Sequence, residues 1–139
     1  MSVIGVVSMK GGVGKTSVTA NLAVALAKTL GPERVCAVDL DPQNALRLHF
    51  GVETDDETGV CSQSIAERNW ASIAFESEHG VRCLPYGEVN ESDRVAFEEI
   101  LHQDSNWIGG NIQASGLDED AIVLIDTPPG PSVYLRQTF

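Results

Sequence analysis

Two lysines and three glycines near the N-terminus have the residue types and the spacing needed to hold a phosphate group. They lie in residues 10–17, KGGVGKTS. Glycines without a Cβ let successive backbone N–H groups turn toward an anion. Lys15 can then reach the β- and γ-phosphates of a nucleotide, and the Thr16 hydroxyl can ligate magnesium. The predicted phosphate-binding residues are Lys10, Gly11, Gly12, Val13, Gly14, Lys15, Thr16 and Ser17.

This loop departs from the common pattern G-x-x-x-x-G-K-[ST]. Met9 occupies the place of the first glycine, and a second lysine, Lys10, follows it. A loop lysine is ordinarily a solvated side chain. Here Lys15 already provides a positive charge for the phosphates. We therefore predict that Lys10 acts as an arginine finger does, reaching a γ-phosphate when a second subunit docks. The sequence does not show whether it acts across such a dimer.

Aspartates stand at the ends of two apolar runs. Asp39 and Asp41 lie at the end of VCAVDL and just after it, and Asp126 closes AIVLID. In open α/β sheets, ligands gather at the carboxyl ends of the strands. A carboxylate there can hold the hydration shell of magnesium, so Asp126 is the predicted metal residue together with Thr16. Each aspartate could instead be a turn former, as in Asp41-Pro42.

These residues need a scaffold of strands and helices to bring them together. Apolar runs rich in β-branched residues predict strands, and apolar spacings of three and four predict helices. Their alternation predicts a parallel α/β sheet with right-handed crossovers. The predicted strands are 3–8, which is expected to be buried, 35–40, 81–86 and 121–126. The predicted helices are 16–30, 43–50, part of 62–75, and 91–102. Residues 109–120 are predicted to be a loop or a frayed helix end.

Side-chain spacing also predicts which faces of two helices point inward. The first helix has apolar residues at Val18, Leu22, Ala23, Leu26 and Leu30. The helix over 91–102 is predicted to turn Val95, Phe97, Ile100 and Leu101 partly inward.

Composition limits the class of protein. The 139 residues are 42% hydrophobic and 21% charged, as in a globular domain. No apolar run approaches the ~18–20 residues that span a bilayer, and the N-terminus lacks the pattern of a secretory signal. Three cysteines without C-x-x-C spacing argue against a disulfide framework or a zinc site, so Cys36 and Cys83 are predicted core residues of a reduced, cytoplasmic protein.

The net charge of −11 is concentrated in the middle of the chain. Residues 51–120 contain 16 acidic and three basic side chains. A surface of this sign repels nucleic acid and anionic lipid. We therefore expect no direct nucleic-acid binding by this part, which is either a solvated acidic face or a docking surface for a basic partner.

KGGVGKTS, VDLDPQN and LIDTPPG together resemble the deviant Walker A ATPases of the ParA/MinD type, in the SIMIBI class. The resemblance implies a P-loop NTPase with three α/β/α layers, binding ATP and Mg²⁺ and switching as an ATP-dependent homodimer. It implies that Lys10 crosses the dimer, Lys15 and Thr16 contact phosphate and magnesium, Asp41 positions or activates water, Asp39 supports the metal site and Asp126 is the Walker B aspartate.

A narrower resemblance rests on DLDPQNALRLHFGV, LPYG and IDTPPGPSVYLRQ. These stretches are similar to the ParA-like proteins of bacterial cellulose-synthase operons, the BcsQ type. This implies an accessory role in cellulose synthesis or export. It also implies a cytoplasmic protein that is recruited to the inner membrane or the cell pole, with components of the cellulose-synthase complex as partners.

Family members continue well beyond the strand that ends at Asp126, whereas this chain has 13 further residues. Residues 1–139 are therefore expected to be the N-terminal part of a single P-loop ATPase domain, truncated after the Walker B strand. Three other functions stay open at this stage: a chromosome or plasmid partition or positioning ATPase, a truncated non-catalytic nucleotide-binding module, and a metabolic kinase or ligase with a related loop.

Overall fold

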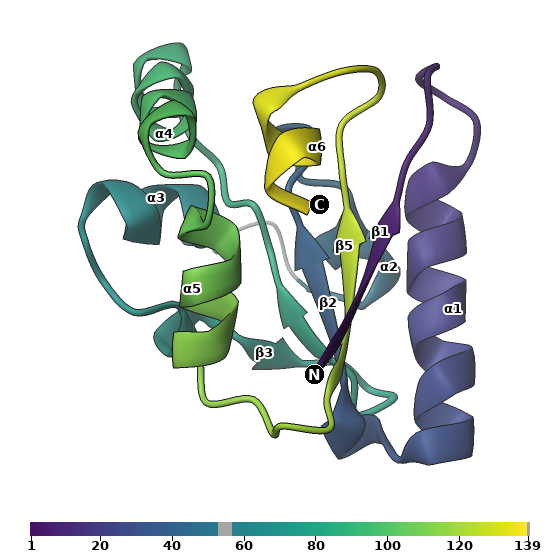
Figure 1. Cartoon of the computed structure of the whole chain (residues 1–139). Coiled ribbons are helices and arrows are strands. Elements are labelled where there is room, and N and C mark those ends of the chain that lie inside the picture. Colours follow the sequence, from purple (N-terminus) through teal and green to yellow (C-terminus); the bar gives the residue numbers. More distant parts are fainter. Residues whose placement is uncertain (53–56, 139) are drawn as a thin grey trace.

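The computed structural model describes residues 1–52 and 57–138. A five-stranded sheet of order β1-β5-β2-β4-β3 forms its centre (Figure 1). The first four strands in that order are parallel, and β3 is antiparallel to β4. The strands are β1 (Ser2–Val6), β2 (Val35–Asp39), β3 (Phe75–Glu76), β4 (Arg82–Leu84) and β5 (Ile122–Asp126).

Helices cover both faces of this sheet, which gives the three layers predicted from the sequence (Figure 1). The helices α1 (Lys15–Leu30) and α2 (Leu46–His49) pack on one face. The opposite face carries α3 (Val60–Ile65), α4 (Glu91–Gln103), α5 (Trp107–Ala114) and α6 (Val133–Thr138). Two short 3₁₀ turns, Pro32–Arg34 and Trp70–Ile73, complete the elements.

The register of the central strands brings the predicted site residues to one edge of the sheet. Val6 of β1 and Asp39 of β2 both pair with Asp126 of β5. The carboxyl ends of three parallel strands therefore meet at the same level, as expected where loops of an α/β sheet bind a ligand.

The buried face of α1 differs from the predicted one. Ala20, Ala23 and Ala27 face the sheet, whereas Val18 is 56% exposed and Leu22 36% exposed. Small side chains let this helix lie close to the backbone of the sheet. The alanine face therefore packs against the sheet in place of the face that carries the bulkier apolar residues. The predicted inward positions of Val18 and Leu22 are therefore wrong.

β1 was predicted as a buried strand, and it is instead an edge strand of the described sheet. Val3 is 48% exposed and Ile4 38% exposed. An apolar run of this kind fits a central strand or an edge strand equally well. It predicts that a strand forms, but not how many strands lie beside it in the sheet.

Three smaller corrections concern the second half of the chain. Residues 109–120, predicted as a loop or a frayed helix end, begin inside α5, which runs to Ala114 despite Gly109 and Gly110 because Ile108 and Ile112 are buried against the core. On α4, Phe97 is buried but Val95 is 53% exposed. The short antiparallel β3 was not predicted at all.

The remaining elements agree with the prediction within a few residues. The helix expected over 43–50 is shorter, and only part of 62–75 is helical, as predicted. Cys36 and Cys83 are buried and free, as is Cys61, which confirms the predicted core positions. Within the described part of the chain, no helix is long and apolar enough to cross a membrane.

Candidate functional site

The loop between β1 and α1 turns at two glycines. Gly12 has φ 70° and Gly14 has φ 83°, a backbone conformation that side chains with a Cβ rarely adopt. Gly14 directly precedes the first residue of α1. The loop therefore ends at a helix N-terminus, where free N–H groups and the helix dipole favour an anion.

A cavity of about 430 Å³ opens over this loop. Its walls contain all eight residues predicted to bind phosphate, together with Asp41. Sequence reasoning missed three further lining residues: Ser8, Gln43 and Pro129. Two of these belong to the quoted motifs VDLDPQN and LIDTPPG, so only their motif membership could have signalled them.

The loop is tied to the segment that follows β5. Gly130 N–H donates a hydrogen bond of 2.7 Å to Ser8 O. Thr127 Oγ1 donates to Val6 O over 3.0 Å. Residues 127–130 are therefore held against the end of β1 and the start of the glycine loop, and Pro129 among them lines the cavity.

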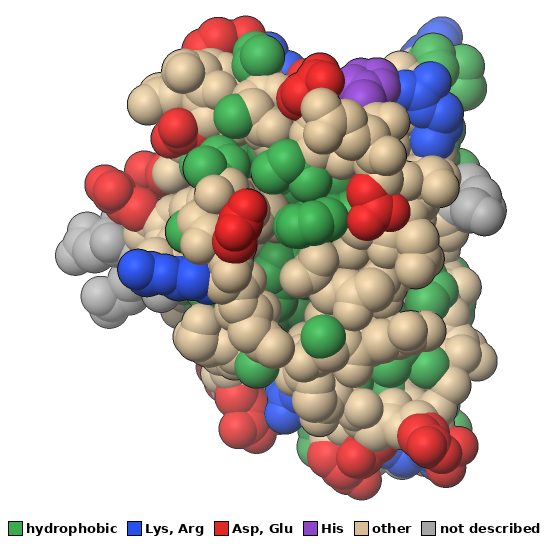
Figure 2. Space-filling view, turned by 60° about the vertical axis from the view of Figure 1, so that its left-hand side comes forward, with side chains coloured by type: hydrophobic (Ala, Val, Ile, Leu, Met, Phe, Trp, Pro, Cys, Tyr) green, Lys and Arg blue, Asp and Glu red, His purple; other side chains and the backbone are tan. Residues whose placement is uncertain are grey.

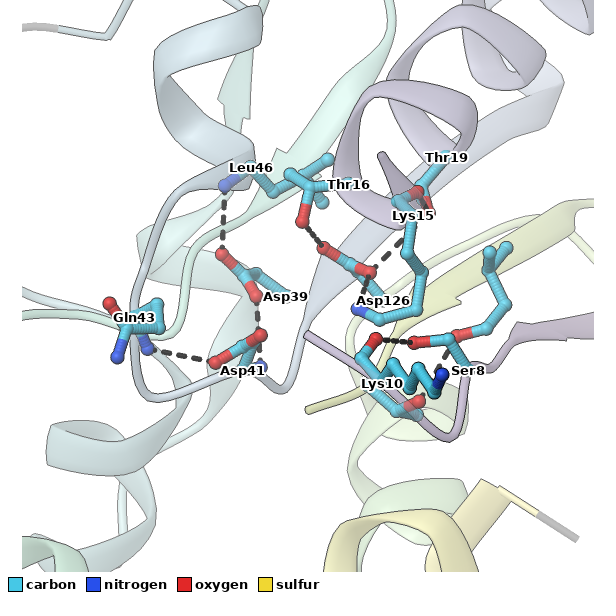
Figure 3. Close-up of polar contacts among 12 residues, drawn as sticks. Ser8, Lys10, Lys15, Thr16, Thr19, Asp39, Asp41, Gln43, Leu46 and Asp126 are labelled. Carbon is cyan, nitrogen blue, oxygen red and sulfur yellow. Dashed lines mark hydrogen bonds and ion pairs between the residues drawn. The ribbon is translucent and has the colours of Figure 1, made fainter. Parts of the chain in front are cut away.

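Asp126 is the buried anchor of this site (Figure 3). Its Oδ1 lies 2.6 Å from Lys15 Nζ, and its Oδ2 accepts a hydrogen bond of 2.7 Å from Thr16 Oγ1. Thr19, one helical turn after Lys15, donates to Lys15 O at 2.9 Å and lies 3.5 Å from Asp126 Oδ1. The buried carboxylate is thus balanced by the Lys15 ammonium group and the Thr16 hydroxyl, as a buried charge requires.

Asp39 organises the loop that follows β2. Both of its oxygens accept backbone hydrogen bonds: Oδ1 from Asp41 N at 2.9 Å and Oδ2 from Leu46 N at 3.1 Å. Burial raises the pKa of Asp39 to about 8, with nearby Asp126 adding to the rise and the two N–H donors opposing it. In this structure Asp39 holds the loop and does not line the cavity, so its predicted support of a metal stays a prediction.

Asp41 and Lys10 lie on the wall of the cavity. Asp41 Oδ1 accepts a hydrogen bond of 2.9 Å from Gln43 N, which fixes its carboxylate beside the cavity (Figure 3). Lys10 is exposed, and Ser8 Oγ bonds its carbonyl oxygen at 2.9 Å. The Lys10 backbone is therefore held by the loop while its ammonium group stays in solvent.

The residues of the site fit a magnesium ion that is bound partly by the phosphates of a nucleotide. The described residues contain no group of three or more His, Cys, Asp or Glu side chains able to hold a metal alone. Mg²⁺ usually keeps several waters and binds through one or two protein oxygens plus substrate phosphates. The Thr16 hydroxyl and the Asp126 carboxylate, in contact with each other, provide such oxygens.

A larger cavity, about 580 Å³, lies at the amino ends of the strands, around Pro32, Arg82 and Leu117. It has no glycine loop leading into a helix N-terminus and no lysine among its walls. Volume alone therefore does not mark the candidate site, which is the smaller cavity because of its glycine loop and its two lysines.

The fold and the loop together define a P-loop protein of the ParA/MinD class. Solved structures support this class. A MinD from Pyrococcus horikoshii, complexed with Mg-ADP, has a TM-score of 0.77 and is 29% identical, covering 99% of this chain and 53% of that one. A cobyrinic acid a,c-diamide synthase from Mycobacterium smegmatis, with a bound ATP analogue and magnesium, has a TM-score of 0.82 and is 26% identical, covering 99% and 55%.

The family is narrower than the class. A model of the cellulose biosynthesis protein BcsQ family matches residues 1–139, and the chain belongs to this family. The BcsQ of Salmonella typhimurium is 32% identical over 141 residues, which covers 99% of this chain and 54% of that protein. The chain thus spans about half the length of this curated relative.

Proposed function

We propose that the protein is an ATP-binding and ATP-hydrolysing dimeric switch. One observation carries this proposal: Lys15 and Thr16, at the start of α1, both contact Asp126 at the end of β5, beneath a cavity walled by the glycine loop. A lysine that can bind phosphate lies next to a hydroxyl and a carboxylate that can bind magnesium. This combination suits a nucleotide triphosphate with its Mg²⁺ ion.

In this proposal each residue of the chain has one task. The loop N–H groups orient the phosphates, and Lys15 exchanges its contact with Asp126 for one with the β- and γ-phosphates. Thr16 and Asp126 would hold Mg²⁺, which neutralises charge that develops during phosphoryl transfer. Asp41, fixed beside the cavity by Gln43 N–H, orients the attacking water.

The dimer is proposed because of Lys10. Its side chain is exposed at the cavity wall, and in the described residues it makes no ion pair. A second copy whose loop faced this cavity would bring its own Lys10 to the γ-phosphate, where a cation stabilises the transition state. The switch would then close when ATP is present and open after hydrolysis.

The biological setting is proposed from the family. The BcsQ relative carries cellulose biosynthesis in its name. We propose an accessory role in cellulose synthesis for this protein, with cellulose-synthase components as partners, and recruitment from the cytoplasm to the inner membrane or the cell pole.

Two other functions have less support. The acidic residues of 51–120 oppose direct DNA binding by this part of the chain, as a partition ATPase would need; residues 53–56 of that segment lie outside the described structure. A fold shared with a diamide synthase does not transfer that activity, because function depends on the site and not on the fold.

Sedimentation velocity and ATP turnover on the full-length protein test this proposal. With Mg²⁺ and a non-hydrolysable ATP analogue, the wild type should sediment as a dimer, and without nucleotide as a monomer. Lys10→Ala should bind ATP but lose turnover, whereas Lys28→Ala, on the far turn of α1, should behave as wild type. A monomer under all conditions, or full turnover by Lys10→Ala, would contradict the dimeric switch.

A further inference from the structure

A shallow groove lies between α3, α4 and α5, on the sheet face opposite α1. Its volume is about 270 Å³, and its walls are Ser64, Ile65, Glu67, Ile100, Gln103, Asp104 and Trp107. Figure 2 shows this side of the molecule, with hydrophobic side chains gathered near its centre and acidic side chains spaced around them.

Two tryptophans meet at Ser64, which lines the groove. The buried Ser64 Oγ accepts hydrogen bonds of 3.1 Å from the indole N–H groups of both Trp70 and Trp107. Trp70 is fully buried, while Trp107 is only partly covered and presents its ring to the groove. A partly exposed aromatic ring in a fixed orientation is a common anchor for a protein partner.

The charge around the groove selects the kind of partner. Among the described residues, its walls include the carboxylates of Glu67 and Asp104 and no Lys or Arg. The nearby Arg94 on α4 is already paired with Glu91 and Glu98. An apolar floor with an acidic rim is complementary to a bulky apolar side chain flanked by basic residues.

The groove also connects to the nucleotide loop through α6. Gln137 donates to the carbonyl oxygens of Leu101 at 2.9 Å and Asp104 at 2.6 Å, and it accepts from Ile108 N at 3.2 Å. One side chain therefore holds the end of α4 against the start of α5. α6 follows residues 127–132, whose Gly130 bonds Ser8 of the phosphate loop.

We propose that this groove is a docking site for a short segment of a partner protein that carries a bulky apolar residue flanked by Lys or Arg. Its volume is below the ~300–1,000 Å³ of most small-molecule sites, which favours side chains of a peptide. We further propose that Gln137 couples docking to the nucleotide site; this coupling rests on the proposed function, whereas the groove itself does not.

An amphipathic peptide of Leu and Lys, labelled with fluorescein, serves as the test ligand in fluorescence anisotropy with the full-length, nucleotide-free protein. Ile100→Asp should weaken binding by about tenfold or more. Val95→Asp, on the exposed side of the same helix, is the matched control and should change the Kd by less than about twofold.

Both variants add one negative charge, so non-specific attraction of the basic peptide predicts equal, slightly tighter binding in each. That result, or no binding to the wild type, would overturn the proposal.

Ile100→Asp could also disturb folding, so a second pair of variants changes only exposed charged side chains. Glu67→Lys should weaken binding about threefold at low salt, and Glu78→Lys, at the β3–β4 turn, should not. Equal weakening by both lysine variants would also overturn it.

The coupling is tested by repeating the titration with Mg²⁺ and a non-hydrolysable ATP analogue. Nucleotide should change the peptide Kd about threefold or more, and Gln137→Ala should abolish that change while the neighbouring Arg136→Ala keeps it. An unchanged nucleotide effect in Gln137→Ala would overturn the coupling. Failure to bind nucleotide at all would contradict the proposed function and leave the nucleotide-free result on the groove standing.

Discussion

Lys15 and Asp126 are 111 positions apart in the sequence, and the Lys15 ammonium lies 2.6 Å from the Asp126 carboxylate in the buried centre of the site. This pair joins the first turn of α1 to the last residue of β5. Each group offsets the charge of the other in this buried place, which an unpaired charge would destabilise. A nucleotide that draws Lys15 away must provide a replacement cation for Asp126, which is why phosphate and magnesium binding are expected to depend on each other.

Lys15→Ala should abolish ATP binding, raising the Kd more than about tenfold, because the β/γ-phosphate charge loses its partner. The change also leaves Asp126 buried without a cation, which should lower the free energy of unfolding by about 3–5 kcal/mol unless the carboxyl takes up a proton. Isothermal titration calorimetry and urea unfolding measure the two effects. Lys28→Ala is the control on the same helix, and unchanged ATP affinity in Lys15→Ala would refute the site assignment.

Asp126→Asn should test the magnesium site, although it also leaves the buried Lys15 ammonium without its carboxylate. The amide keeps a carbonyl oxygen for Thr16 Oγ1 but removes the negative charge that would attract the metal. In wild type, Mg-ATP at about 100 times its Kd should stabilise the protein by about 2.7 kcal/mol. We expect Asp126→Asn to lose the part of this gain that depends on Mg²⁺, measured as thermal shifts with Mg²⁺ and with EDTA. Asp118→Asn, in an exposed turn, should keep it.

Asp41→Asn should bind ATP normally and hydrolyse it about 10²–10⁴-fold more slowly, because an amide cannot take a proton from water. An asparagine oxygen can still accept the hydrogen bond from Gln43 N, so the loop should keep its shape. If hydrolysis is what opens the dimer, this variant should accumulate as an ATP-bound dimer in the full-length protein. Turnover at the wild-type rate would show that Asp41 does not position the water.

The residues of the glycine loop were predictable one by one because the motif is local, while their binding of phosphate stays a prediction. Eight adjacent residues carry the motif, and all eight line one cavity. The approach of Asp126 to Lys15 was predictable only in outline, from the rule that parallel strands end at one edge. The position of Thr19 was not predictable, because nothing in the sequence marks a helical threonine as a neighbour of a carboxylate at the end of a strand.

The prediction of the fold was wrong at positions where tertiary packing outweighs the local sequence pattern. α5 contains two adjacent glycines and reads as a loop, yet Ile108 and Ile112 bury against the core and hold it helical. On α1 the pattern favoured Val18 over Ala20, although the close approach to the sheet selects the smaller residue. Neither preference can be deduced without knowing the neighbouring element.

The three cysteine thiols should be inert in the folded protein. Burial raises the pKa of Cys36 to about 12 and that of Cys61 to about 11, and it raises the pKa of Cys83 as well. At pH 8 the reactive thiolate is therefore scarce, and Ellman's reagent should label all three thiols only after denaturant is added. Fast labelling of a native thiol would contradict the buried positions.

The same shifts fix the sign of a pH dependence. The unfolded chain releases thiol protons near pH 9, whereas the folded chain holds them to higher pH. Above about pH 9 the unfolded state binds fewer protons, so the free energy of unfolding should fall as pH rises. Replacing Cys36 with Ala should reduce this slope in urea unfolding measured between about pH 8 and 10; a slope unaffected by the replacement would rule out its thiol as a source.

Tyr134→Phe should destabilise the protein by about 1–2 kcal/mol while leaving its aromatic packing in place. The Tyr134 hydroxyl lies 2.8 Å from that of Tyr86 and donates to Glu98 Oε1 at 3.1 Å. Both tyrosine rings and Phe97 have centroids 6.0–6.1 Å apart, a contact the phenylalanine ring would keep. The loss should therefore come from the hydroxyl, which bonds the buried Tyr86 hydroxyl and Glu98 Oε1, although Glu98 keeps its contact with Arg94.

Urea unfolding of Tyr134→Phe, Tyr86→Phe and the double variant measures the coupling between the two hydroxyls. Because they share one hydrogen bond, the double variant should lose less stability than the sum of the single losses, by about 0.5–3 kcal/mol. Thr29→Val removes an exposed hydroxyl from α1 and should change stability by no more than about 0.5 kcal/mol. Strict additivity of the two tyrosine changes would show that the two hydroxyls contribute separately.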